Sequence, residues 1–186
     1  MIEKLVKCGK TYLFAFLLTS CLAQNAAEAS SVKCQDLLID VGVFQANWSA
    51  GHYFEAAPYY GAVEQCAINF YVLNGNAGQI VYRYKNKARA ERGYRHMLES
   101  LPTNESDFLL DTSPTVFRFS TVADETHLSC YSRNSISICR ALARYGTDVV
   151  SFNTYVGPSF MNRDEFGEIL HAIDKRMLDN LRSQED

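Results

Sequence analysis

The chain has 186 residues, of which 47% are hydrophobic and 21% charged, and its formal net charge is −3. This length suits one domain with a core of its own. The mildly acidic charge excludes a typical nucleic-acid-binding protein, which neutralises phosphates with clustered Lys and Arg, and the sequence offers no polybasic patch for anionic lipid. We therefore expect no nucleic-acid partner.

The N-terminal segment has the parts of an export signal. Lys4, Lys7 and Lys10 precede an apolar run over residues 12–18. A helix needs roughly 20 apolar residues to span a bilayer, so this short run predicts a signal peptide over residues 1–20 and no transmembrane anchor. Removing that segment takes away three Lys and one Glu, which leaves a net charge of −5.

The apolar run ends at the sequence LTSC over residues 18–21. This sequence resembles the lipobox of bacterial lipoproteins, and the resemblance implies cleavage before Cys21 and membrane attachment through lipid on that residue. Leu22 follows, where an Asp would signal inner-membrane retention in many enterobacteria-like systems. The alternative is the A-x-A site that ends at Ala29, where ordinary signal peptidase would release a secreted protein. Both interpretations place the folded part outside the cytoplasm.

Three regions follow from these signals. The segment after Cys21 consists mostly of Ala, Gln, Asn, Glu and Ser, which is typical of a flexible link of low hydrophobicity. We therefore expect a lipoprotein signal peptide over residues 1–20, a tether over 21–33 and a single extracytoplasmic domain over 34–186.

An aromatic segment covers residues 44–61 and includes the only Trp of the chain. No period of 2 or 3.6 persists through it, so it reads as a long ordered loop, and such loops often carry function. Aromatic rings there suit stacking on a sugar or an apolar ligand. The other interpretation is that the rings only hold the loop against the sheet. The candidate ligand-binding residues are Trp48, Tyr53, Phe54, Tyr59 and Tyr60.

The segment after Cys66 predicts two strands and a helix. Strands over 67–73 and 79–84 are separated by a Gly/Asn turn, and a helix follows over 87–101. Pro102 lies just past the end of that helix, as expected for a stop. The apolar stripe of the helix is formed by Ala90, Tyr94, Met97, Leu98 and Leu101.

The segment after Cys139 repeats this order of elements, as an internal β-β-α duplication would. A strand runs to Tyr145, a second covers residues 148–156, and a helix begins at Asn162, whose side chain can cap it in a box with Glu165. Further strands are predicted over 115–121 and 127–133. The stripe of the last helix is formed by Phe166, Ile169, Leu170, Ile173, Met177 and Leu181.

Four cysteines remain after the signal region, and paired cysteines are the default in an oxidising compartment. Three pairings exist in principle. A two-residue turn at 134–135 places Cys130 opposite Cys139 at a non-hydrogen-bonded pair, where Cα atoms approach to about 4.5 Å, near the short end of the disulfide range. Cys34 then pairs with Cys66 by elimination. No C-x-x-C is present, and the wide spacing does not suit zinc.

These elements predict an α+β domain with an antiparallel curved sheet of about six strands, two amphipathic helices on one face, and two disulfides. Strand-strand-helix units with paired cysteines resemble, in architecture, the disulfide-bonded extracytoplasmic sensor domains of some bacterial kinases and lipoproteins. The resemblance implies a sensor-like domain outside the membrane.

No chemical motif accompanies this architecture. Residues 124–127 (DETH) place two carboxylates beside an imidazole, but His52, His96 and His171 do not add ligands at a metal-binding spacing. The polar run therefore reads as a turn, with no metal and no cofactor. Motifs for hydrolases, nucleotides and zinc proteases are absent from the sequence. We expect a non-enzymatic domain that binds a small ligand or an envelope protein; the weaker alternative is an envelope hydrolase without a recognisable motif.

Overall fold

The computed structural model describes residues 32–45, 47–73, 75–101, 109–110, 120–133, 136–157 and 159–182. The predicted signal peptide, the lipobox, Ala29 and nearly all of the tether lie outside the described residues, as does most of the strand expected over 115–121. Among the helices of the described ranges, none is both long and apolar enough to cross a membrane.

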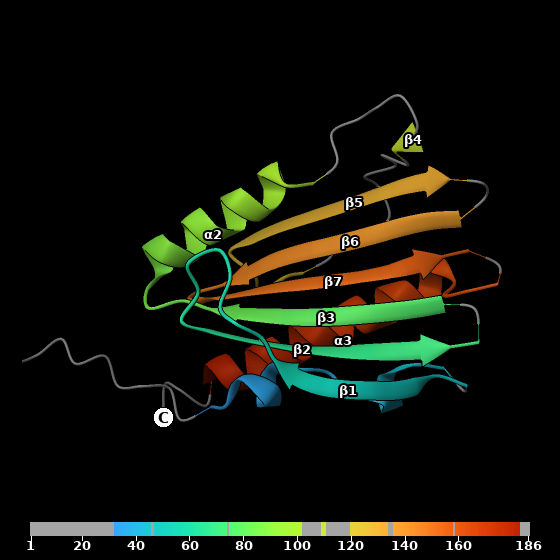
Figure 1. Ribbon diagram of the computed structural model, residues 1–186, viewed down its shortest axis with the longest axis horizontal. Coiled ribbons are helices and arrows are strands. Elements are labelled where there is room, and N and C mark those ends of the chain that lie inside the picture. Colours follow the sequence, from blue (N-terminus) through green and yellow to red (C-terminus); the bar gives the residue numbers. More distant parts are fainter. Residues whose placement is uncertain are drawn as a thin grey trace, which may run out of the picture. The chain divides into compact units, whose positions relative to one another are not determined.

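The described domain is built on one antiparallel sheet in the order β1-β2-β3-β7-β6-β5-β4 (Figure 1). Six strands are long and β4 has only two residues, which confirms the predicted α+β class and its sheet of about six strands. The strands are β1 (Ser49–Glu55), β2 (Glu64–Val72), β3 (Gly75–Arg83), β4 (Leu109–Leu110), β5 (Glu125–Arg133), β6 (Ile136–Tyr145) and β7 (Asp148–Val156).

The hairpin register is confirmed for β5 and β6, where Tyr131 pairs with Ile138 and Cys130 with Cys139. The register of β2 and β3 is continuous from Glu64–Arg83 to Val72–Gly75. The Gly/Asn-rich residues expected to form a broad turn therefore belong to β3, because two neighbouring strands supply a full ladder of partners there.

Both predicted helices are present, as α2 (Lys87–Glu99) and α3 (Arg163–Arg182). The Asn86 side chain accepts a hydrogen bond from the Arg89 N–H at 3.0 Å, and Asn162 accepts one from the Glu165 N–H at 2.9 Å. Each helix is thus capped by a side-chain amide at its first turn, where backbone N–H groups have no partner within the helix.

The two helices pack on opposite faces of the sheet, so the expectation that both cover one face is wrong. Tyr82 and Val149 pack with α2, whereas their neighbours Val81 and Val150 pack with α3. The central strands β3 and β7 have buried side chains on both faces, so the alternation of polar and apolar residues along them could not show that each face receives its own helix. Figure 1 shows α2 in front of the sheet and α3 behind it. We call these two sides the α2 face and the α3 face.

Opposite faces also weigh against an internal duplication. The central strands β3 and β7 are antiparallel, so a twofold axis perpendicular to the sheet would superpose β2–β3 on β6–β7. That rotation would leave both helices on the same face. The two β-β-α units therefore share their element order but have opposite hands, and no rotation superposes them.

The α3 face holds the larger core, which includes the N-terminal segment with the short 3-10 helices η1 (Cys34–Leu37) and η2 (Val41–Val43). The Cys34–Cys66 disulfide joins η1 to β2, with a Cα–Cα distance of 6.0 Å. Fully buried Gln79 accepts a hydrogen bond from the Ile39 N–H at 2.8 Å and donates one to the Leu37 carbonyl at 3.3 Å.

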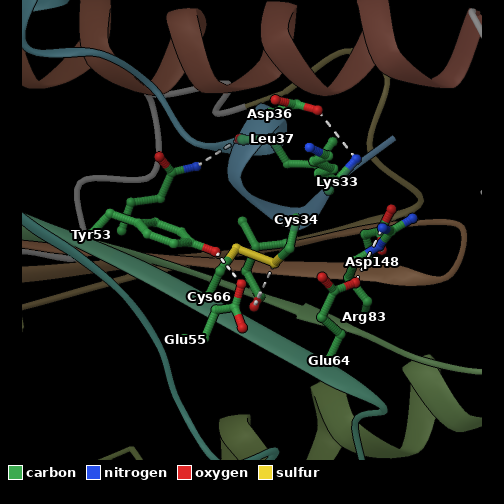
Figure 2. Close-up of a disulfide and its surroundings, with 12 residues drawn as sticks. Lys33, Cys34, Asp36, Leu37, Tyr53, Glu55, Glu64, Cys66, Arg83 and Asp148 are labelled. Carbon is green, nitrogen blue, oxygen red and sulfur yellow. Dashed lines mark hydrogen bonds and ion pairs between the residues drawn. A yellow bond between two sulfur atoms is a disulfide. The ribbon is translucent and has the colours of Figure 1, made fainter. Parts of the chain in front are cut away.

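Arg83 holds the start of this segment (Figure 2). Its guanidinium donates to the Val32 carbonyl at 2.6 Å and forms ion pairs with Glu64 and Asp148, both at 3.2 Å. Burial raises the pKa of Asp148, and the adjacent Arg83 opposes that shift. A disulfide, a buried amide and a guanidinium therefore fix the N-terminal segment on the α3 face.

Candidate functional site

A cavity of about 360 Å³ lies on the α2 face, beside the C-terminal end of α2. We call it the Arg140 pocket. It occupies the half of this face beyond the residues that pack under α2. Its described lining is Asn76, Ser100, Leu101, Ser129, Tyr131, Ile138, Arg140, Asn153, Thr154 and Tyr155.

A polar row across three strands forms one part of the floor. Arg140 of β6 lies opposite Ser129 of β5 on one side and Asn153 of β7 on the other. Residues directly opposite each other in adjacent strands point to the same face of a sheet. Leu142, two residues along β6, packs under α2, so the three polar residues also point to the α2 face.

An apolar row forms the next part of the floor. Ile138 of β6 lies opposite Tyr131 of β5 and Tyr155 of β7. The Tyr155 ring also contacts Phe160, with ring centroids 5.7 Å apart. The isoleucine side chain between two tyrosines thus forms an apolar surface beside the polar row. The pocket offers a polar and an apolar surface to one ligand.

Gly78 allows two amide side chains to approach each other over β3. It lies opposite Asn69 of β2 and Asn153 of β7. A Cβ at this position would lie 3.1 Å from the Asn69 Oδ1 and 3.2 Å from the Asn153 Oδ1, which is tighter than an ordinary contact. The absence of a side chain at Gly78 therefore leaves the Asn153 amide room at the edge of the pocket.

The C-terminal end of α2 closes the pocket on another side through Ser100 and Leu101. The Ser100 hydroxyl donates to the Met97 carbonyl at 2.7 Å, and the Tyr60 hydroxyl lies 3.5 Å from it. The last carbonyls of a helix carry partial negative charge. The pocket therefore has an arginine on its floor and the negative end of a helix dipole at its helical side.

Arg140 differs from Arg83 and Arg144, which also lie in the sheet. Arg83 and Arg144 each bind two carboxylates, whereas half-buried Arg140 has no ion pair within the part of the chain that the structure describes. The described lining of the pocket contains no Asp or Glu. Since burying a charge without a partner is costly, a cation in this position favours an anionic group in the cavity.

The structure does not bring the five predicted aromatic residues together. Trp48 is half-buried against the α3-face core, with its ring 4.9 Å from that of Phe44. Tyr53 and Phe54 are consecutive residues of β1 and point to opposite faces, at 38% and 43% exposure. The Tyr53 hydroxyl donates to Glu55 at 3.0 Å, close to the Cys34–Cys66 disulfide (Figure 2).

The expectation that residues 44–61 form one long loop is wrong for residues 49–55, which form β1. The pairing of β1 with β2 shifts register between Ala50 and Tyr53. This irregularity interrupts the period of two by which a strand is recognised in sequence. Beyond the strand, Tyr59 is 65% exposed and its ring contacts that of half-buried Tyr60 edge-on at 4.7 Å.

Residues 124–127 form the start of β5 and the residue before it. Arg144 binds Asp124 at 2.9 Å and Glu125 at 2.8 Å, and Asp124 also accepts from the Gly146 N–H at 2.8 Å. Both carboxylates are thus engaged in holding the β6–β7 turn. Within the described ranges, no three His, Cys, Asp or Glu residues converge as a metal site would require.

The Arg140 pocket was not predicted from the sequence. Its signal is an arginine and an asparagine in the interiors of two largely buried strands, at Arg140 and Asn153. The strand boundaries and the β5–β6 register place Arg140 opposite Ser129. Asn153 and Asn76 join them only through the pairing of β7 with β6 and β3, which depends on contacts distant in sequence.

Comparison with known protein families and with curated proteins gives no match. Among solved structures, the chain is similar to the crystal structure of the extracellular domain of PknH from Mycobacterium tuberculosis. The TM-score is 0.54 at 12% sequence identity, and the alignment covers 80% of this chain and 97% of that one. At this identity the likeness concerns the fold alone.

Proposed function

We propose that the chain is a membrane-tethered extracytoplasmic domain that binds a small polar ligand in the Arg140 pocket without catalysing a reaction. The observation that carries this proposal is a half-buried arginine on the floor of a cavity whose described lining supplies it with no carboxylate. Core packing does not require a charge there, whereas a ligand site uses a few placed polar groups on an otherwise apolar surface.

The location outside the cytoplasm is supported by two observations. Both disulfides join cysteines that the fold brings together, and such bonds persist in oxidising compartments. The chain is also similar in fold to an extracellular domain. With the lipobox, these observations support attachment to the membrane through lipid on Cys21.

The absence of catalysis is part of the proposal. The described lining offers the hydroxyls of Ser100 and Ser129 but no histidine or carboxylate to activate either of them. A serine nucleophile needs such a base within hydrogen-bond reach. The lining therefore supports recognition of a ligand better than hydrolysis.

A screen of small metabolites by thermal shift on the purified full chain tests the binding function. We expect at least one compound to raise the unfolding midpoint, and Asn153→Trp, which fills the pocket, to abolish that rise. The matched control is Asn180→Trp on α3, which lies outside the pocket lining. Ligand stabilisation that survives in Asn153→Trp would place binding elsewhere and contradict the proposal.

Lipid attachment is tested in a bacterial host by metabolic labelling with a fatty acid. We expect label and membrane fractionation for the wild-type chain, and loss of both in Cys21→Ser. An unlabelled mature protein that begins at Ser30 would instead establish release by ordinary signal peptidase.

An envelope protein is the second candidate partner, and a specific surface favours it. β1 is the edge strand of the sheet, and several large exposed hydrophobic side chains lie on or beside β1 and β2. They are Tyr53, Phe54, Val63, Tyr71 and Leu73. Cross-linking from this edge, with no metabolite bound in the pocket, would favour the protein partner.

A further inference from the structure

The following inference rests on the proposed ligand-binding function and specifies the ligand. We propose that the Arg140 pocket binds a saccharide unit that carries a single carboxylate, as a hexuronate does. Three features of the lining lead to this class: one cation, a surface of two tyrosines and an isoleucine, and neutral polar groups around them.

The charge of the pocket selects an anion. Arg140 presents a planar set of donors that matches a carboxylate with two parallel hydrogen bonds. The described lining contains no second cation and no acid. The other charged feature is the C-terminal end of α2 at Ser100, where the helix dipole is negative. One carboxylate at Arg140 is therefore favoured, and a second anionic group near the helix end is not.

The rest of the lining suits a hydroxylated ring. Asn76, Asn153 and Ser129 can each donate and accept hydrogen bonds, which matches hydroxyl groups that do both, and the Ser100 oxygen can accept. These groups offer no net charge and therefore complement the part of the ligand beyond its carboxylate.

The apolar row supplies a surface for the ring itself. Tyr131, Ile138 and Tyr155 lie side by side on β5, β6 and β7. A pyranose has a face of C–H groups that packs on such a surface, while its edge carries the hydroxyls. The polar and apolar rows are parallel and adjacent, so one ring can contact both.

The size of the cavity restricts the ligand to a small molecule. About 360 Å³ is near the lower end of the ~300–1,000 Å³ typical of small-molecule sites. One or two sugar rings fit this volume. A folded protein domain does not, so any larger saccharide would enter through a terminal unit.

The test compares glucuronate with glucose, which differ in the carboxylate at C6, by saturation-transfer-difference NMR on the purified full chain. We expect glucuronate to bind at least tenfold more tightly than glucose, and Arg140→Gln to remove that preference. Arg140→Lys keeps the charge without the planar donors and should retain part of the preference for glucuronate. Arg92→Gln, an exposed change on α2 with the same loss of charge, should leave it intact. Thermal unfolding verifies that each variant folds.

Three results would overturn the inference. They are equal affinity for the two sugars, no binding of glucuronate, and tighter binding of benzoate, which has a carboxylate without hydroxyls. These three results would leave the proposed binding function standing. That function is tested separately, by a metabolite whose stabilising effect is lost in Asn153→Trp. Loss of the preference in Arg92→Gln would also count against the assignment to Arg140.

Discussion

The two faces of the sheet differ in how their buried polar groups are satisfied. On the α3 face, Gln79 binds two backbone groups, and Asp174 accepts from the hydroxyls of Ser120 and Tyr145. On the α2 face, Arg144 binds Asp124 and Glu125, but the Tyr84 hydroxyl is buried without a partner among the described residues, and Arg140 lacks an ion pair there. Both disulfides lie on the α3 face. The comparison indicates that the cross-links are concentrated on the α3 face, whereas the α2 face has a core of its own beside polar groups that lack partners among the described residues.

Removing the Cys34–Cys66 disulfide tests the α3 face most severely. Cys34→Ser with Cys66→Ser should lower the free energy of unfolding by about 3.7 kcal/mol, because a bridge across 32 residues restricts the unfolded chain. Removing Cys130–Cys139, with a separation of 9 residues, should cost about 1 kcal/mol less. Urea unfolding measures both. A larger loss for the shorter loop would contradict the argument from chain entropy.

Gln79→Leu tests the buried amide on the same face. The change leaves the Ile39 N–H and the Leu37 carbonyl without their partner, so we expect a loss of about 2 kcal/mol. The matched change is Gln65→Leu on the α2 face, where the half-buried amide accepts from the exposed Tyr59 N–H at 3.1 Å. Water can replace that bond, so its loss should stay below about 1 kcal/mol. Equal losses in urea unfolding would remove the distinction between the faces.

The loss of stability at alkaline pH tests whether Tyr94 is buried in the core of the α2 face. Burial raises the pKa of Tyr94 to about 12, above its ordinary value of about 10. The folded state therefore keeps a proton that the unfolded chain releases first, so stability present below pH ~10 is lost as the pH rises toward 12. Tyr94→Phe should reduce this loss by about 1–2 kcal/mol in urea unfolding at pH 8 and pH 11.5. An unchanged pH dependence would assign the loss to other groups.

How much of the fold the sequence predicts depends on how local its determinants are. The helix cap at Asn162 and the Cys130–Cys139 pair depend on neighbours within a few residues, and both predictions are confirmed. The placement of the helices on opposite faces is not local. β3 and β7 have buried side chains on both sides, so their sequence pattern is compatible with helices on either face.

The candidate site shows the same limit. Aromatic residues are conspicuous in sequence, but Trp48 packs against the core and Tyr53 and Phe54 diverge on β1. The pocket is instead assembled from Arg140 and Asn153 of neighbouring strands, together with the end of α2. Its residue types are ordinary, and only the strand order brings them together.

The smallest expected change in stability comes from removing a single hydroxyl oxygen from a buried tyrosine on each face. Tyr145→Phe on the α3 face removes the hydroxyl that donates to buried Asp174 at 3.1 Å, and it should cost about 1.5–2 kcal/mol. Tyr84→Phe on the α2 face removes a buried hydroxyl that has no partner among the described residues, so it should change stability by less than about 0.5 kcal/mol or increase it. The phenol of Tyr84 lies against Gly93 of α2, where the Cβ of any other residue would clash with the hydroxyl oxygen. Urea unfolding of both variants gives the comparison. A loss above 1 kcal/mol for Tyr84→Phe would mean that this hydroxyl has a partner, and the contrast between a satisfied and an unsatisfied face would fail at that position.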